Sequence, residues 1–343
     1  MAGKAKLEWL EFGRGIAAIA VLFSHAGYVG TPEYLIAHVF DLGGWAVAFF
    51  FVLSGFIIFY VHDKDLGKPA RAKNFAWRRF VRIFPTYWLV LIVGLVLRQY
   101  VGSQDFRIEI TAPFLVKQFL LLPGGRLYLS VAWTLRHELL FYTVFFTAVV
   151  NFRVGVVIFC TWLSLIFFGL FTEGIKDDVT RPAWDTLTSH LNLYFFFGMA
   201  IAAAVRRDLL GTAAVGSVSI TALAFIGWYF SESTLPVLQL FACASLVCGA
   251  ALLSIEGFVA PPLSLWLGAI SYPLYLFHLL GFQIAQGILK RVPQIHPTWG
   301  WKLGLSVFIT LFVSVLLSQY YEKRLFRIIK GPKVSLSTSD QAR

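Results

Sequence analysis

The sequence predicts an all-α integral membrane protein with about ten transmembrane helices. Of its 343 residues, 58% are hydrophobic and only 14% are charged, whereas a soluble domain has about 25% charged residues. Apolar runs long enough to cross a bilayer recur along the whole chain. We expect these runs to be helices, because lipid offers no partner for backbone hydrogen bonds and the sequence lacks the alternating pattern of barrel strands.

Ten apolar segments, each close to the ~20 residues that a bilayer requires, give the predicted spans. They cover residues 12–30, 43–61, 83–101, 129–150, 154–171, 187–205, 212–230, 235–253, 263–289 and 303–321. Because no soluble domain interrupts them, we interpret residues 1–330 as a single membrane domain. Residues 331–343 are polar and rich in Ser and Thr, which is typical of a disordered tail.

The distribution of charge predicts that both termini are cytoplasmic. A net charge of +11 can indicate a nucleic-acid partner, but in a multi-pass chain it reflects basic loops on the cytoplasmic side, so we expect no nucleic acid. With the N-terminus inside, the strongly basic loop 62–82 faces the cytoplasm and the acidic loop 172–186 faces outward. An even number of spans then returns the C-terminus to the cytoplasm.

The first span carries two ionisable residues, Arg14 and His25. Such groups are costly to hold inside a membrane, so they are candidates for function. A helix rises 1.5 Å per residue, which places His25 about 16 Å further into the bilayer than Arg14. Arg14 could instead form a plain interfacial ion pair with Glu11, three residues earlier.

Three other spans bring polar groups toward the same buried level: Glu138, His278 and the pair Ser54-Gly55. A shared cavity would explain this convergence, since polar groups avoid lipid and seek partners. Each residue also has a structural alternative. His278 could be an ordinary packed histidine, Glu138 could pair with Arg136, and Ser54-Gly55 could serve only close helix packing.

Arg79 and Arg82 belong to a basic segment just before the third span. Because they are three residues apart, they share one helix face at the cytoplasmic membrane surface. Two guanidinium groups there would suit a ligand that carries phosphate, although the segment could also be an ordinary basic loop. A Gly-rich phosphate loop is absent from the sequence, so we do not expect a nucleotide-hydrolysing motor.

Taken together, these segments resemble the membrane-bound acyltransferase family 3, of the bacterial polysaccharide O-acetyltransferase type. The motifs that carry the resemblance span nearly the whole chain: Arg14-x10-His25, Phe50-Phe-Val-Leu-Ser-Gly-Phe56, Arg79-x-x-Arg82 with Ile83-x-Pro85-x-Tyr87-Trp88, Trp133-Thr-Leu-x-x-Glu138-x-x-Phe141-Tyr142, and Ser271-Tyr-x-Leu-Tyr-Leu-x-His278. One departure is Glu11, where the family more often has Asp; the charge is kept.

The resemblance implies transfer of an acyl group from cytoplasmic acyl-CoA to a carbohydrate hydroxyl at the bacterial inner membrane. The acyl group would be acetyl, with succinyl or longer chains left open, and the acceptor an exopolysaccharide, a lipopolysaccharide or a related glycan, lipid-linked or not. We expect acyl-CoA as a substrate, no permanently bound cofactor and no metal. The three cysteines lie in apolar runs without zinc-site spacing.

Residue roles follow from the motifs and from the chemistry of the side chains. A neutral imidazole can take a proton from a hydroxyl, so His25 is the candidate general base, with Arg14 and Glu138 as further catalytic candidates. The candidates for CoA binding are Arg79, Arg82 and Arg14. The candidates for binding the remaining substrate are His278, Glu11, Ser54 and Tyr272.

Several alternatives stay open at this point. The acyl group could pass directly to the acceptor or first form an acyl-histidine. A transporter or flippase for a glycan or lipid-linked sugar would also bury polar groups, but it predicts internal repeats and paired broken helices, which the sequence does not show. A catalytically silent subunit of a polysaccharide complex would leave the spacing of Arg14 and His25 unexplained.

Overall fold

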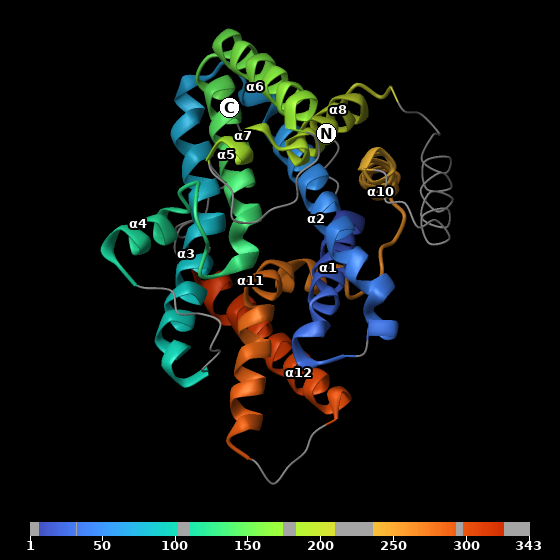
Figure 1. The fold of residues 1–343 in the computed structure, drawn as a ribbon. Coiled ribbons are helices and arrows are strands. Elements are labelled where there is room, and N and C mark those ends of the chain that lie inside the picture. The colour runs from blue at the N-terminus through green and yellow to red at the C-terminus, as the bar shows by residue number, and fades with distance from the viewer. Residues whose placement is uncertain are drawn as a thin grey trace, which may run out of the picture.

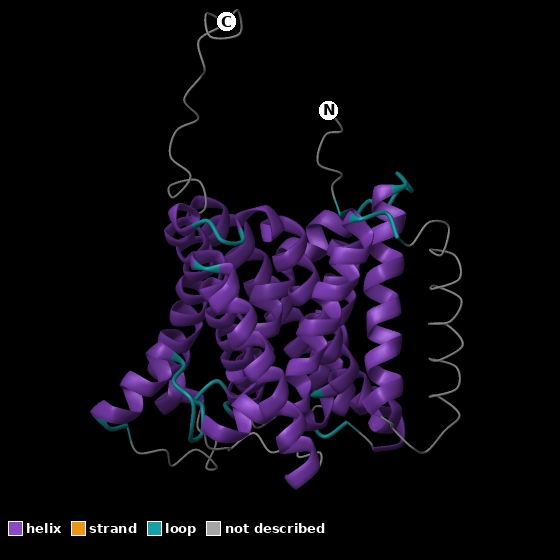
Figure 2. Ribbon diagram, turned by 90° about the horizontal axis from the view of Figure 1, so that it is seen from above, coloured by secondary structure: helices purple, strands orange, loops and turns teal. Residues whose placement is uncertain are grey.

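The described part of the chain consists of helices and their connections, with no strand, as the apolar runs predict. The computed structural model describes residues 7–31, 33–101, 110–173, 183–209, 236–292 and 298–325. Most helices stand side by side with their axes in a common direction (Figure 2). The predicted span 212–230 and the tail 331–343 lie outside the described residues.

The helices are arranged around α1, α2 and α11, which lie near the middle of the bundle (Figure 1). Their bounds are α1 Glu8–Ser24, α2 Glu33–His62, α3 Pro69–Val101, α4 Ala112–Leu120, α5 Trp133–Val150, α6 Phe152–Glu173, α7 Ala183–Thr188, α8 Leu193–Arg206, α10 Pro236–Ile255, α11 Ser264–Lys290 and α12 Trp299–Leu316. Short 3₁₀ helices cover η1 Ala26–Val29, η2 Asp63–Asp65, η3 Ser130–Ala132 and η4 His190–Asn192, and a π-helix, η5 Leu317–Glu322, extends α12.

Within the described residues, six helices are long and apolar enough to cross a membrane. They are Leu42–Asp65, Pro69–Leu97, Phe152–Thr172, Leu238–Ile255, Ser264–Lys290 and Trp299–Leu325. Three other predicted spans correspond to α1, α5 and α8. α1 has 17 residues and α8 has 14, while α5 carries two charged residues, Arg136 and Glu138. The class of integral membrane protein is therefore confirmed, and the count of ten spans stays a prediction.

The basic region 62–82 is mostly helix, so its interpretation as a loop is wrong. α3 begins at Pro69, a residue suited to the first turn of a helix because it has no N–H to satisfy. Ala72 and Phe75 are buried, three positions apart, while the basic residues between and beside them are exposed. The region is an amphipathic extension of the membrane helix.

Two contacts bring distant connections to one end of the bundle. The Trp9 backbone N–H donates to Ser254 Oγ (3.1 Å), and Arg206 Nε lies 2.8 Å from Asp63 Oδ2. The start of α1, the α2–α3 connection and the ends of α8 and α10 therefore share this end. The charge distribution predicts these same segments to be cytoplasmic; the absolute orientation stays a prediction.

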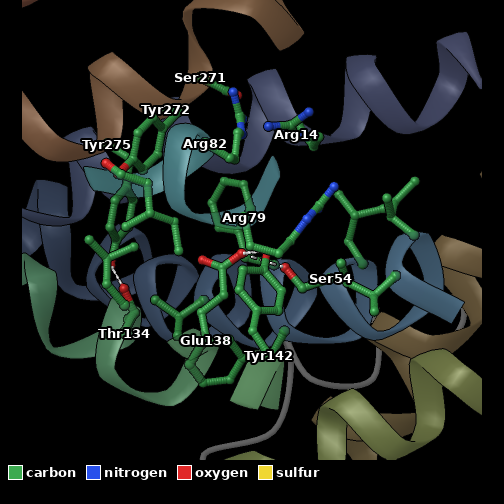
Figure 3. A pocket seen from close by; sticks show the side chains of 18 of the residues that line it. Arg14, Ser54, Arg79, Arg82, Thr134, Glu138, Tyr142, Ser271, Tyr272 and Tyr275 are labelled. Atoms are coloured by element: carbon green, nitrogen blue, oxygen red, sulfur yellow. Dashed lines mark hydrogen bonds between the residues drawn. The ribbon is translucent and has the colours of Figure 1, made fainter. Parts of the chain in front are cut away.

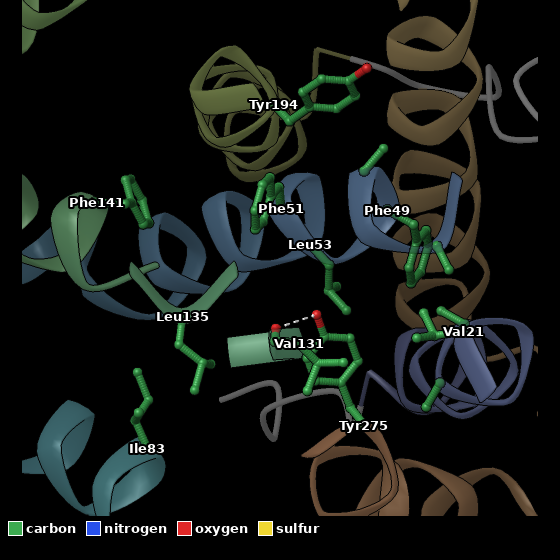
Figure 4. Close-up of a cluster of buried hydrophobic side chains, with 14 of the residues drawn as sticks. Val21, Phe49, Phe51, Leu53, Ile83, Val131, Leu135, Phe141, Tyr194 and Tyr275 are labelled. Carbon is green, nitrogen blue, oxygen red and sulfur yellow. Dashed lines mark hydrogen bonds between the residues drawn. The ribbon is translucent and has the colours of Figure 1, made fainter. Parts of the chain in front are cut away.

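Glycines allow the helices to approach closely. A Cβ on Gly55 of α2 would collide with the carbonyl oxygen of Phe195, and one on Gly198 of α8 would collide with that of Val52. The α2–α8 contact thus uses small residues, as is usual between membrane helices. Large buried side chains such as Phe51 and Phe141 fill the adjacent core (Figure 4). Because one face of α2 packs against α8, the opposite face of α2 is directed toward the site.

Candidate active site

Five helices, α1, α2, α3, α5 and α11, enclose a cavity of about 170 Å³ inside the bundle (Figure 3). A buried water needs about 10–15 Å³ of such space, so the cavity has room for roughly ten waters or a small organic group. Its polar lining comprises Glu11, Arg14, Ser54, Arg79, Arg82, Thr134, Glu138, Tyr142, Ser271, Tyr272 and Tyr275. We refer to it as the arginine cavity.

Three arginines from two helices extend into this cavity: Arg14 from α1, and Arg79 and Arg82 from α3 (Figure 3). The guanidinium carbon of Arg79 lies 5.6 Å from the ring centroid of Tyr142, and that of Arg82 lies 5.1 Å from that of Tyr272. Aromatic faces attract cations at such distances. The guanidinium groups of Arg79 and Arg82 are therefore held by aromatic rings, a contact that does not use the N–H donors that can bind an anion.

Two acidic residues share the cavity with the arginines. Glu11 pairs with Arg14 at 3.0 Å, so the predicted interfacial pair does form, but it lines the cavity. Glu138 accepts hydrogen bonds from Tyr142 Oη and, at 3.4 Å, from Ser54 Oγ. The acidic groups thus balance part of the positive charge, and the hydrogen bond from Ser54 to Glu138 connects α2 and α5 across the cavity.

Arg136 turns away from Glu138, which excludes the structural ion pair that their proximity in the sequence allowed. Its Nη1 donates to the carbonyl oxygen of Gly125 at 3.0 Å and its Nη2 to that of Gly124 at 3.4 Å. Arg136 therefore holds the connection before α5, and Glu138 alone faces the cavity.

The partly buried His25 and the buried His278 form a second polar cluster, the histidine pair, with ring centroids 4.9 Å apart. His25 Nδ1 lies 2.9 Å from the carbonyl oxygen of Val21, and His278 Nδ1 lies 2.7 Å from that of Tyr275. A carbonyl can only accept, so both rings carry their proton on Nδ1 and keep a lone pair on Nε2. His278 is fully buried, and its Nε2 has no hydrogen-bond partner in the described part of the chain.

The polar residues that were expected to share one cavity therefore form two neighbouring clusters. The arginine cavity contains Glu11, Arg14, Ser54, Arg79, Arg82, Glu138 and Tyr272, and the histidine pair contains His25 and His278. Arg79 and Arg82 are partly buried and line the cavity; their depth at the cytoplasmic membrane surface stays a prediction. Tyr275 borders both clusters, since it lines the cavity and its ring centroid lies 6.1 Å from that of His278.

Sequence reasoning missed several residues of the site. Tyr142 and Tyr275 stand inside motifs that were recognised, and Tyr142 follows Glu138 by four residues, the spacing of neighbours on a helix face. Glu322 is 5% exposed and accepts a hydrogen bond from Thr86 Oγ1 at 2.9 Å, one turn beyond Arg82 on α3. No pattern marks it, because its position depends on the π-helix that ends α12; π-helical turns are frequent at functional sites.

No group of three or more His, Cys, Asp or Glu that could hold a metal ion occurs among the described residues. The side chains suited to an anionic coenzyme are the three arginines of the cavity. The site thus combines the arginine cavity with the neighbouring histidine pair, whose Nε2 atoms can accept a proton.

The fold and the site define a protein of apolar, membrane-length helices that contains a buried cavity with three arginines. The chain belongs to the family described as "Acyltransferase domain" (acyltransferase family 3), whose model matches residues 7–320. The protein is therefore an acyltransferase of the kind that transfers groups other than aminoacyl groups. The resemblance that the motifs indicated is confirmed, and the family favours an enzyme over a transporter or a silent subunit.

Two relatives are similar to the chain over most of its length. The chain is similar to "Exopolysaccharide production protein ExoZ" of Rhizobium meliloti (strain 1021), with 29% identity over 300 residues that cover 81% of this chain and 86% of that protein. It is also similar to the "O-acetyl transferase" of Shigella phage Sf6, with 26% identity over 351 residues, 96% of this chain and 99% of the relative. No solved structure matches the chain with comparable significance.

Proposed function

We propose that this protein is an O-acetyltransferase of the bacterial inner membrane. It moves an acetyl group from cytoplasmic acetyl-CoA to a hydroxyl of an exopolysaccharide, a lipopolysaccharide or a related glycan. The observation that carries the proposal is the convergence of Arg14, Arg79 and Arg82 in one buried cavity beside the histidine pair. The names of both relatives support a polysaccharide acceptor and an acetyl group.

The donor side of the proposal rests on charge. CoA carries several phosphate charges, and guanidinium groups bind phosphate through paired N–H donors. Arg79 and Arg82 lie on α3, which begins at the end of the bundle where the cytoplasmic face is predicted. The phosphates would bind Arg79, Arg82 and Arg14, and the flexible arm of CoA would carry the thioester along α1 toward His25, about 16 Å of helix rise from Arg14.

The chemistry rests on the tautomer of His25. Its Nδ1–H is committed to the carbonyl of Val21, so Nε2 can take the proton of the acceptor hydroxyl. The hydroxyl oxygen attacks the thioester carbonyl, the C–S bond breaks, and the proton passes from Nε2 to the departing thiolate. Arg14 or another cavity cation would stabilise the negative charge that develops on the carbonyl oxygen.

The remaining residues would position these groups. Glu11 orients Arg14 through their 3.0 Å ion pair, and Glu138 is oriented by Ser54 and Tyr142. Tyr272 would stack against Arg82. His278 would accept a hydrogen bond from the acceptor through its unpartnered Nε2. In an alternative route, the His25 Nε2 attacks the thioester first and forms an acyl-histidine.

Acetylation of surface polysaccharide in cells tests the proposal. A strain without the gene is complemented with the wild type or with His25→Ala, and the acetyl content of its purified polysaccharide is measured by mass spectrometry. We expect the wild type to restore acetylation and the variant to fail at equal protein level in the membrane. Full restoration by His25→Ala would refute the role of His25.

A second measurement separates the two routes. Purified protein is incubated with radiolabelled acetyl-CoA in the absence of acceptor, and label that stays on the denatured protein is counted. Direct transfer predicts no label, whereas label that disappears in His25→Ala would establish the acyl-histidine.

A further inference from the structure

The end of the arginine cavity that faces the histidine pair is lined on α2 by apolar residues. Ser24, which precedes His25, packs against Gly43 of α2. The first part of α2 therefore lies nearest to His25, and later residues of α2 lie progressively further from it. Among those that line the cavity, Val47 and Phe50 are the nearest to the histidine pair.

On α11, later residues lie closer to the histidine pair. Glu11 lies against Gly268, and His25 lies beside His278, so α11 is parallel to α1. Tyr275 is thus the last residue of α11 to line the cavity before His278 is reached. Figure 3 shows Tyr275 and Thr134 on one side of the cavity and Arg14 and Ser54 on the other.

The rings of Phe50 and Tyr275 meet between the two clusters, with centroids 5.8 Å apart and planes at 69°. Long side chains lean toward the N-terminus of their helix, and α2 and α11 begin at opposite ends of the bundle, so the two rings converge. The Tyr275 hydroxyl is fixed by Thr134 Oγ1 at 2.8 Å (Figure 3) and by the carbonyl oxygen of Val131 at 3.0 Å (Figure 4). The contact is therefore a rigid wall at the end of the cavity.

We infer that Phe50 and Tyr275 limit the transferred acyl group to the size of acetyl. The inference rests on the proposed function, in which the thioester arrives from the cavity and the acceptor hydroxyl is held at the histidine pair. The two reactants then meet at this ring contact. A longer chain on the thioester has to displace a ring whose hydroxyl bonds or packing hold it in place.

Competition between two donors tests the inference. Inverted inner-membrane vesicles from the source strain, with the chromosomal copy deleted and the wild type or a variant supplied, receive equal amounts of acetyl-CoA and butyryl-CoA. Acyl groups on the extracted glycan are counted by mass spectrometry. In Phe50→Ala we expect the butyryl-to-acetyl ratio to rise roughly fifteen-fold, because two methylenes gain room at about 0.8 kcal/mol each.

The ratio is internal to each sample, so it does not depend on how much of a variant folds. Phe49→Ala is the matched control: it removes the same ring from the adjacent position of α2, which is buried but does not line the cavity. Its ratio should equal that of the wild type. Phe50→Leu, a milder change, should raise the ratio about fourfold, because it makes room for roughly one methylene.

The outcomes are distinct. An unchanged ratio in both Phe50 variants, or an equal rise in Phe49→Ala, overturns the inference while acetyl transfer by the wild type continues to support the proposed function. Absence of acetyl transfer by the wild type in the same vesicles overturns the proposed function itself, and the inference with it.

Discussion

The arginine cavity and the histidine pair are both buried and polar, but their groups are satisfied in different ways. In the cavity, a charged side chain is contacted by an uncharged polar or aromatic side chain of another helix, as with Glu138 and Ser54 or Arg82 and Tyr272. In the pair, each imidazole is held by a carbonyl of its own helix, and the Nε2 of His278 has no partner among the described residues.

This difference separates collective recognition from single-atom chemistry. A cavity with three cations loses only part of its affinity for an anion when one of them changes. A base that presents one nitrogen loses its function altogether. Substitutions in the two regions should therefore differ both in size and in the kinetic constant that they affect.

Loss of the base should have the largest effect. In His25→Gln we expect kcat to fall about 10²–10⁴-fold, the usual contribution of general acid–base catalysis, while KM for acetyl-CoA changes little. The measurement is steady-state transfer in membrane vesicles. His62→Gln serves as a control, because His62 is buried against Asp65 outside the cavity; a comparable fall in kcat there would show that any buried histidine is required for folding.

The second histidine should matter less. In His278→Gln an amide replaces the Nε2 acceptor, and loss of one hydrogen bond to the acceptor should lower kcat/KM for the glycan about tenfold, or 1.4 kcal/mol. If the two histidines act on the same substrate, the double variant should be no slower than His25→Gln. Additive losses would show that they act independently.

Changes to the arginines should appear in donor binding. Arg82→Lys keeps the charge but loses the paired donors, so we expect KM for acetyl-CoA to rise about fivefold to tenfold, with kcat nearly unchanged. Arg79→Lys should behave in the same way. Arg78→Lys is the matched control: Arg78 neighbours Arg79 on α3, is exposed and donates to Asn74, so an equal rise there would contradict recognition by the cavity.

The smallest effect belongs to Ser54→Ala. Its hydrogen bond to Glu138 is long, at 3.4 Å, and such a bond is worth about 1 kcal/mol or less. We expect a loss of kcat/KM of less than about fivefold. The adjacent Gly55→Ala should differ in kind: its Cβ collides with the carbonyl oxygen of Phe195, so the amount of folded protein in the membrane should fall, as measured by size-exclusion chromatography in detergent.

Sequence patterns predicted much of this arrangement because they depend on local rules. Hydrophobic length gave the helices near their observed positions, and residue spacing indicated that Arg79 and Arg82 share a face. The motif around Glu138 lies where α5 meets the cavity. In each case the helical repeat alone decides which side chains can lie together.

What the sequence could not predict depends on tertiary contacts. Nothing local distinguishes Arg136, which holds the carbonyl of Gly125, from Glu138, which faces the cavity two residues later. Nothing local shows that the ring of Tyr275 lies between the cavity and His278, or that its hydroxyl contacts Thr134, which lies 141 residues earlier in the chain. The contact of Glu322 with Thr86 bridges 236 residues, and no spacing rule reaches across that interval.

Separating donor binding from transfer tests the central claim most directly. The affinity of purified protein for acetyl-CoA is measured by isothermal titration calorimetry for the wild type, for His25→Gln and for the double variant with Arg79→Ala and Arg82→Ala. We predict that His25→Gln binds acetyl-CoA within about twofold of the wild type yet transfers acetyl at least about a hundredfold more slowly, whereas the double variant loses at least about tenfold in affinity. Loss of binding in His25→Gln, or binding by the double variant equal to that of the wild type, would contradict the division of work between the two regions.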